Sequence, residues 1–286
     1  MTRTVNFAGH QLPAIGQGTW HMGDGHYTAE QEVDGLRRGL DLGLTLIDTA
    51  EMYGNGRSES IVGRAVKGRR DDAFIVSKAV PSNASKQRLK EACERSLSCL
   101  GVESLDLYLL HWPGSTPLSE TLEGFEQLID EGKIKRWGVS NFDTSDTNAL
   151  ARTSGSRDCA TNQVLYNLGS RGIEFDLRPR LRELDIPLMA YCPVAQGGSA
   201  NRHLVNHPVV QEIAAQHNAS PTQLLLAWAI RPFNDEQDLI AIPKAVTPAH
   251  IEENARALEI TLSAEQLAKL DEAFPPPTRP EPLDIV

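Results

Sequence analysis

FIVSKAVPSNASKQRLKEACERSLSCLGVESLDLYLL, residues 74–110, is the stretch that decides the fold class. It begins with the aliphatic run 74–78 and ends with a second such run, 105–110, and each has the length of a buried strand. Between them, residues 86–100 carry apolar side chains at three- and four-residue spacing, which predicts an amphipathic helix. A strand, a helix and another strand in this order predict a parallel sheet with helical crossovers.

The same alternation continues in both directions along the chain. Further strands are predicted at residues 15–20, 46–48, 136–140, 160–163, 188–191 and 239–242. Further helices are predicted at residues 30–42, 118–131, 175–184 and 221–230. Together with the two strands of the deciding stretch, these segments predict the eight strands of a closed (β/α)8 barrel.

A polar residue stands at the end of nearly every predicted strand. In chain order these residues are Thr19, Asp48, Lys78, His111, Ser140, Gln163, Tyr191 and Lys244. Because barrel active sites lie at the carboxyl ends of the strands, this placement favours a TIM barrel of the α/β class, formed as one domain over residues 1–286. A Rossmann fold is disfavoured, since Gly16-Gln17-Gly18 lacks a third glycine at the required spacing.

The interval between Tyr191 and Lys244 is longer than the others and predicts an added segment. Residues 192–220 are rich in Gly, Asn and His. We expect a lengthened loop there, with a short helix at 208–215 above the barrel mouth. Residues 201–203 are predicted to be mobile.

Composition limits the partners and the compartment. The net charge is −10 and the basic residues are scattered, so no surface for nucleic acid or an anionic membrane is expected. The polar N-terminus and the lack of any long apolar run predict a cytoplasmic protein without a membrane span. The four cysteines form no CxxC pair, and His203 and His207 have no third ligand nearby, so no metal site is predicted.

Four residues at or just beyond strand ends would meet at one barrel mouth: Asp48, Tyr53, Lys78 and His111. A phenol, with an ordinary pKa of about 10, donates its proton readily only when a nearby cation stabilises the phenolate, and Lys78 can be that cation. Asp48 would hold the ammonium in place, and His111 could orient a substrate carbonyl through a hydrogen bond. The set predicts carbonyl reduction.

Several segments carry a resemblance to a known family. GLTLIDTAEMY (43–53), VSK (76–78) and LLHW (109–112) resemble the catalytic segments of the aldo-keto reductase family. GVSNF (138–142), NQV (162–164), AYCP (190–193) and IPK (242–244) are similar to its cofactor-binding segments. Within the family, QGTW (17–20), CATNQVLY (159–166) and LDIV (283–286) are most similar to bacterial members that reduce methylglyoxal and related small aldehydes.

The resemblance implies NADPH-dependent reduction of small aldehydes or ketones to alcohols, with Tyr53 as the general acid. It implies that Tyr191 stacks on the nicotinamide while Ser140, Asn141 and Gln163 bind its carboxamide. The residues that it implies for cofactor binding are Gly18, Thr19, Trp20, Asp48, Ser140, Asn141, Gln163, Tyr191, Pro193, Lys244, Ala245, His250, Glu253 and Asn254.

The sequence departs from the family pattern after the last strand. Many relatives carry a Ser directly after the Lys at this site and an Arg six residues after it, whereas this chain has Ala245 and His250. Arg binds phosphate through a permanently charged fork, while His is mostly neutral near pH 7. We therefore expect a weakened preference for NADPH, with NADH as a possible weaker alternative.

Substrate contacts are expected from Trp20, Tyr53, His111 and Trp112, with Met52 beside them. The Pro275-Pro276-Pro277 run ends a predicted helix at 263–273, and we expect the remaining tail to rest over the barrel rim. Because this tail is short, the pocket should be open. Small carbonyl substrates such as methylglyoxal are predicted.

Competing interpretations remain open at this point. Any one of the four mouth residues has an ordinary structural role, and only their joint position favours catalysis. A nicotinamide-binding redox sensor or interaction module would share the fold and the cofactor. A barrel aldolase would use Lys78 as a neutral Schiff-base amine, which a neighbouring Asp48 disfavours. Monomers are common in the family, and we expect a monomer.

Overall fold

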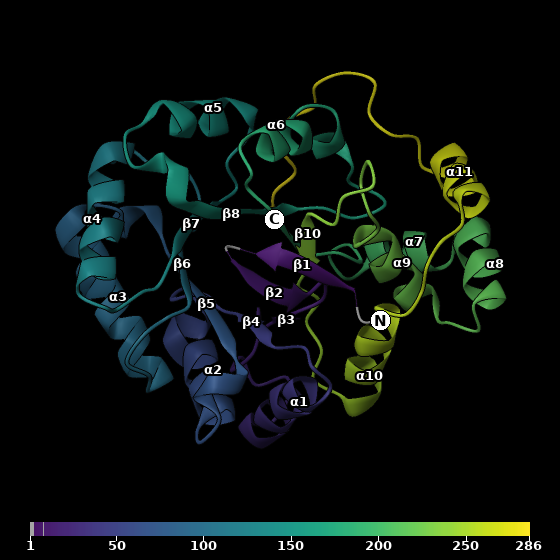
Figure 1. Cartoon of the computed structure of the whole chain (residues 1–286). Helices are drawn as coiled ribbons and strands as arrows, with labels where there is room; N and C mark the ends of the chain where they lie inside the picture. Colours follow the sequence, from purple (N-terminus) through teal and green to yellow (C-terminus); the bar gives the residue numbers. More distant parts are fainter. Residues whose placement is uncertain (1–2, 8) are drawn as a thin grey trace.

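The computed structural model describes residues 3–7 and 9–286, and their central feature is a parallel sheet. Its strands are β3 (Gln17–Gly18), β4 (Leu46–Asp48), β5 (Phe74–Ala79), β6 (Leu107–Leu110), β7 (Trp137–Ser140), β8 (Cys159–Leu165), β9 (Leu188–Tyr191) and β10 (Leu239–Ala241). Each strand pairs with the next one along the chain. The backbone N–H of Gly16 donates to the Ala241 carbonyl at 2.8 Å, and Gly18 donates to the Pro243 carbonyl at 3.0 Å. These bonds close the sheet on itself, which confirms the predicted (β/α)8 barrel (Figure 1).

Helices surround the barrel in Figure 1. They are α1 (Ala29–Asp41), α2 (Arg57–Val66), α3 (Lys86–Leu100), α4 (Leu118–Asp130), α5 (Thr144–Arg152), α6 (Leu177–Glu183), α7 (Ser199–Val205), α8 (Pro208–Gln216), α9 (Pro221–Ala229), α10 (Pro248–Ala257) and α11 (Ala264–Ala273). Single 3₁₀ turns lie at Tyr53–Gly56, Arg70–Asp72, Pro81–Asn83, Ser156–Asp158 and Gly172–Glu174. Capping boxes begin four helices, at Thr28, Asp143, Ser220 and Ser263. The side chain of each accepts from a backbone N–H that would otherwise lack a partner.

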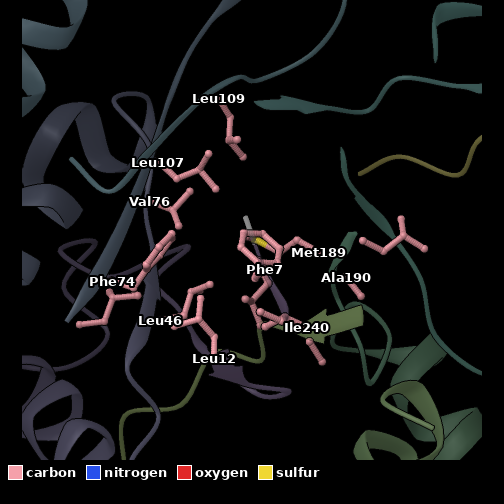
Figure 2. Packing of buried hydrophobic residues seen from close by; sticks show 14 of the residues in the cluster. Phe7, Leu12, Leu46, Phe74, Val76, Leu107, Leu109, Met189, Ala190 and Ile240 are labelled. Carbon is pink, nitrogen blue, oxygen red and sulfur yellow. The ribbon is translucent and has the colours of Figure 1, made fainter. Parts of the chain in front are cut away.

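An N-terminal hairpin fills the barrel at the end opposite the polar strand ends. Its strands are β1 (Thr4–Phe7) and β2 (His10–Pro13), paired antiparallel. Figure 2 shows Phe7 and Leu12 among side chains of the barrel strands, including Leu46 and Ile240. Because these side chains are buried, the hairpin seals one end of the apolar core and leaves the other end for a site.

The segment after Tyr191 differs in one way from our expectation. Residues 201–203, whose mobility stays a prediction, lie in helix α7, where Leu204 is buried and Asn201 donates to the Val194 carbonyl. The helix predicted at 208–215 is present as α8, but it packs on α9 and α11 at the outside of the barrel instead of above the mouth (Figure 1). Tertiary contacts with its neighbours place it there.

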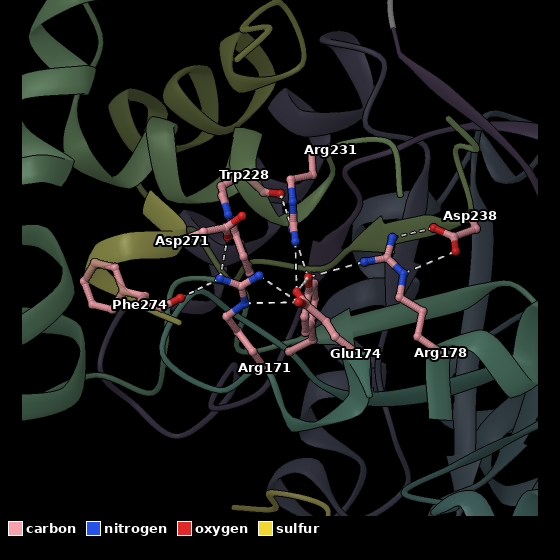
Figure 3. Close-up of polar contacts among 9 residues, drawn as sticks. Arg171, Glu174, Arg178, Trp228, Arg231, Asp238, Asp271 and Phe274 are labelled. Carbon is pink, nitrogen blue, oxygen red and sulfur yellow. Dashed lines mark hydrogen bonds and ion pairs between the residues drawn. The ribbon is translucent and has the colours of Figure 1, made fainter. Parts of the chain in front are cut away.

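A network of arginines and acids fixes the last helix to the barrel (Figure 3). Arg171 donates to the Asp271 carboxylate at 2.7 Å and to the Phe274 carbonyl at 2.6 Å, at the carboxyl end of α11. Arg171 also pairs with Glu174, which in turn pairs with Arg231. The tail that follows α11 is therefore anchored at its start.

The tail returns to the barrel mouth, as expected from the sequence. Ile285 and Val286 line the cavity described below. No helix among residues 3–7 and 9–286 is long and apolar enough to cross a membrane.

Candidate active site

A cavity of about 1050 Å³ opens at the carboxyl ends of the barrel strands. Most residues predicted for the site line it: Gly18, Thr19, Trp20, Asp48, Met52, Tyr53, His111, Trp112, Ser140, Asn141, Gln163, Tyr191, Pro193 and Lys244. Lys78 lies directly behind this wall and is fully buried. The barrel geometry thus brings together residues that are far apart in the sequence.

Asp48 and Lys78 reach the cavity because both are inward-facing residues near the ends of adjacent strands. Asp48 ends β4, and its register partner on β5 is Val76, two residues before Lys78. Side chains two residues apart on a strand point to the same face. Tyr53 comes from the loop after β4, where Gly54 and Asn55 adopt positive φ angles of 56° and 52°. The phenol ring at the start of this turn lies over Lys78, whose Nζ is 4.6 Å from the ring centre.

The Lys78 ammonium contacts three oxygens. Its Nζ lies 2.8 Å from Oδ2 of Asp48, 2.9 Å from the Thr49 carbonyl and 3.0 Å from the Tyr53 hydroxyl. An ammonium has three N–H bonds, and each has one acceptor here. This geometry fits a charged lysine and leaves no free amine for the Schiff-base chemistry of an aldolase.

Burial and neighbouring charge set the protonation of these groups. Burial lowers the pKa of Lys78, but Asp48 and Tyr53 more than offset this effect, so the pKa stands above its usual value. Burial raises the pKa of Tyr53, and the Lys78 ammonium opposes part of that rise. Burial, with Lys78 nearby, lowers the pKa of His111 to about 2. At neutral pH the site therefore holds a charged lysine, a protonated phenol and a neutral imidazole.

Amide and hydroxyl groups form the opposite wall. Gln163 donates to Oδ1 of Asp48 at 2.7 Å, and the Ser140 hydroxyl donates to the Gln163 carbonyl. The Tyr191 hydroxyl donates to Oδ1 of Asn141 at 2.8 Å. Because these bonds fix the amides and the phenol ring, this wall offers a flat aromatic face beside preorganised polar groups.

Four residues expected at the cofactor site do not line this cavity: Ala245, His250, Glu253 and Asn254. His250 is exposed in the first turn of α10, and Asn254 is a buried residue of the same helix. Lys244, just before them, does line the cavity, and its Nζ lies 5.3 Å from the centre of the Tyr27 ring. The structure thus places these four side chains outside the lining of the cavity.

The cavity also has lining residues that the sequence did not single out as site residues. These are His21, Pro113, Cys192, Val194, Ala195, Gln196, Gly197, Asn201, Ile242, Pro243, Ile285 and Val286. Three kinds of signal pointed toward part of this set: the long interval after Tyr191, the tail, and the segments AYCP (190–193) and IPK (242–244), which contain Cys192, Ile242 and Pro243. The first two signals identified no individual residues, because these positions depend on how the loop and tail fold back over the mouth.

The chain is similar in sequence and in structure to known aldo/keto reductases. Residues 14–274 match the model of the Aldo/keto reductase family. The chain is 50% identical to methylglyoxal reductase YeaE of Escherichia coli (strain K12), over 99% of both chains. It is 31% identical to a 9,11-endoperoxide prostaglandin H2 reductase of Trypanosoma cruzi (strain CL Brener), over 92% of this chain and 88% of the relative. Among solved structures, an aldo-keto reductase from Klebsiella pneumoniae in complex with NADPH superposes with a TM-score of 0.96, at 50% identity and 100% coverage of both chains.

Proposed function

The chain belongs to the aldo/keto reductase family, and from this premise we propose that it reduces small reactive aldehydes such as methylglyoxal, with NADPH as the reductant. Its reaction class is NADPH-dependent reduction of a carbonyl to an alcohol. The observation that carries the proposal is the contact of Lys78 with both Asp48 and Tyr53 at the base of the cavity. This contact supplies a positioned proton donor.

The cavity wall fits a nicotinamide dinucleotide. Ser140, Asn141 and Gln163 offer donors and acceptors suited to a carboxamide, the Tyr191 ring offers a stacking face, and Lys244 offers a cation for phosphate. When bound, the cofactor supplies a hydride to the carbonyl carbon. We also propose, from the family resemblance, that Ala245, His250, Glu253 and Asn254 contact its adenosine end.

The residues of this chain handle the proton. Tyr53 donates its hydroxyl proton to the carbonyl oxygen as negative charge develops there, and the Lys78 ammonium stabilises the resulting phenolate. Asp48 keeps that ammonium charged and in place. Nδ1 of His111 is buried without a hydrogen-bond partner among the described residues, which favours the proton on Nε2, where it can donate to the substrate oxygen.

The substrates that we propose are small, reactive carbonyl compounds. The relative from E. coli is named for methylglyoxal reduction, and it covers nearly the whole chain. Trp20, Trp112 and Met52 border the cavity with apolar surface, and Ile285 and Val286 of the tail add to its apolar lining. Such a site can hold a short carbonyl compound against the reacting groups.

The test is the absorbance of the reduced nicotinamide band, measured with purified protein and methylglyoxal, in parallel with NADPH and with NADH. We expect aldehyde-dependent loss of NADPH and slower loss of NADH. If neither cofactor is consumed with a panel of small aldehydes although NADPH binds, the reductase proposal is wrong and a sensor role replaces it.

We further propose that the chain forms one domain and acts as a monomer in the cytoplasm. The absence of a membrane-spanning helix among residues 3–7 and 9–286 is compatible with this proposal. Size-exclusion chromatography with light scattering should give a mass near 31.4 kDa. A mass twice as large would contradict the monomer.

A further inference from the structure

Glu59 is a buried acid that the reaction does not use. Its side chain lies in the first turn of α2 and is only 1% exposed, outside the cavity. Burying a carboxylate is costly unless it is hydrogen-bonded. Its Oε1 accepts a hydrogen bond of 2.7 Å from the Ser77 hydroxyl on β5. This bond joins two elements that both lead to the catalytic groups.

On β5, the hydrogen-bond donor is Ser77, the residue directly before Lys78. Side chains alternate along β5, so Lys78 points into the barrel while Ser77 points outward to α2. Ser77 is fully buried and sits in the middle of a paired strand, between β4 and β6. The strand therefore offers Glu59 a fixed attachment point one residue from the catalytic ammonium.

On the helix side, Glu59 follows the turn that carries Tyr53. Gly54, Asn55 and Gly56 have φ angles of 56°, 52° and 84° in succession, and Gly56, the N-cap of α2, makes no side-chain cap. A run of positive φ angles is costly for a residue other than glycine and persists only where its surroundings hold it. The start of α2 is the nearest regular element that can hold this turn.

The preceding residue makes a second attachment. The Ser58 hydroxyl lies 2.7 Å from Oγ1 of Thr19, at the end of β3, and 3.1 Å from Oγ1 of Thr49, after β4. All three hydroxyls belong to fully buried residues. Ser58 thus ties α2 to the strands on one side of the turn, and Glu59 ties it to the strand that bears Lys78.

We propose that Glu59 is a positioning residue of the reductase, acting through its hydrogen bond with Ser77 to hold the Tyr53 turn in register with Lys78. This inference rests on the proposed reductase function. The bond matters because Tyr53 and Lys78 must stay within hydrogen-bond distance, now 3.0 Å, for proton transfer. A misplacement of about 1 Å at such a site costs about 100-fold in rate.

The experiment compares Glu59→Ala, Glu59→Gln and Ser77→Ala with the wild type, with Glu91→Ala on the exposed face of α3 as a control. The rate of NADPH oxidation in a single turnover with methylglyoxal is measured, since product release can limit steady-state rates. Glu59→Ala and Ser77→Ala should each slow this step by about 10- to 100-fold, with the affinity for NADPH unchanged. The double variant should be no slower than the slower single variant.

Glu59→Gln separates the hydrogen bond from the charge. Glutamine keeps an acceptor oxygen for Ser77, so its rate should stay within about threefold of the wild-type rate. If Glu59→Gln is as slow as Glu59→Ala, the positioning bond is not the cause and the proposal is overturned. If Glu59→Ala and Ser77→Ala lower the melting temperature but leave the single-turnover rate unchanged, the residue is only structural and the proposal is also overturned.

Hydrogen–deuterium exchange gives a readout that does not require activity. The amides of residues 50–58 should exchange faster in Glu59→Ala and Ser77→Ala than in the wild type or Glu91→Ala. Unchanged exchange would overturn the proposal even if the wild type proved inactive, whereas wild-type inactivity alone would refute only the reductase function. If Glu59→Ala fails to fold, Ser77→Ala decides.

Discussion

The hydroxyl of Tyr53 lies 3.0 Å from Nζ of Lys78, although the two residues belong to different segments of the barrel mouth. The contact connects a neutral acid to a cation that can stabilise its conjugate base. Because Lys78 is also fully buried and paired with Asp48, a substitution of Lys78 should affect the stability of the fold as well as the activity.

Tyr53→Phe removes only the donated proton and its oxygen. We expect the variant to lose about 100- to 10,000-fold in reductase rate, the contribution of a general acid, because the ring still fills the same space. The rate is measured as aldehyde-dependent oxidation of NADPH. A fluorescence titration should show unchanged NADPH binding, and a rate within a few-fold of wild type would reject Tyr53 as the acid.

Lys78→Met leaves the Asp48 carboxylate buried without its counter-ion. Breaking a buried ion pair in this way costs about 3–5 kcal/mol in the free energy of unfolding, and activity should fall with it. Denaturant unfolding measures the loss. The double variant Lys78→Met/Asp48→Asn should recover part of the stability but none of the activity. Equal stability of the single and double variants would argue against the ion pair.

The reductase rate should not change near pH 6.5, where a histidine with an ordinary pKa would lose its proton. Burial, aided by Lys78, lowers the pKa of His111 to about 2, so His111 is neutral throughout the physiological range. Since burial raises the pKa of Tyr53 above its usual value, the rate should hold through neutral pH and fall only in alkali as the phenol loses its proton. A rate profile with a break near pH 6.5 that disappears in His111→Gln would contradict this.

Asp106, far from the cavity, should account for part of the acid sensitivity of the fold. Burial favours a raised pKa, but Lys135, the Ile75 backbone N–H and Arg70 hold the pKa of this carboxyl below its usual value. Its contribution is therefore present above the unfolded pKa, about 3.9, and is lost as pH falls through the folded pKa.

Asp106→Asn should lower the free energy of unfolding by about 2 kcal/mol at pH 7 and by less as the solution is acidified. Urea unfolding across this range measures both values. The reductase rate of the folded variant should match the wild type, because Asp106 lies just before β6, at the end of the strand opposite His111. A difference in the free energy of unfolding between Asp106→Asn and the wild type that grows as the pH falls would contradict this prediction.

Cofactor preference should respond to the exposed residue His250. If the 2′-phosphate of NADPH lies beside α10, His250→Arg adds a fixed cation and should tighten NADPH binding by about tenfold, or about 1.4 kcal/mol, with NADH unaffected. Fluorescence titration with both cofactors tests this. Equal tightening of both would place His250 near a group that the two cofactors share.

Much of the barrel could be predicted from the sequence, because aliphatic runs and helical periodicity recur at regular intervals. The predicted and observed bounds agree at 46–48, 86–100 and 188–191. The first strand was predicted too long: only Gln17–Gly18 is a regular strand, paired with β4, and the contacts of Ile15 with Ala241 and of Gly18 with Lys244 are isolated bridges. Polar residues at strand ends correctly located the cavity, because parallel strands share one direction and their carboxyl ends meet at the same end of the barrel.

Other parts depend on contacts that the sequence does not display. The hairpin escaped prediction although Val5 and Phe7 alternate with polar residues, because so short a strand is stable only when it packs into the barrel. Helix α7 forms in a segment rich in Gly, Asn and His, stabilised by buried Leu204. The path of the tail depends on the hydrogen bond from Arg171 to the Phe274 carbonyl, between residues about one hundred positions apart.

The bond between Gly16 and Ala241 has a further consequence for the newly made chain. The barrel can close only after β10 has left the ribosome. Until then, the backbone groups of residues 15–18 that bond to the last strand have no partner. During that time the nascent barrel exposes two open sheet edges, which can pair with other chains. A protein shortened before residue 239 would keep both edges permanently, so its fate is aggregation or proteolysis instead of a smaller working enzyme.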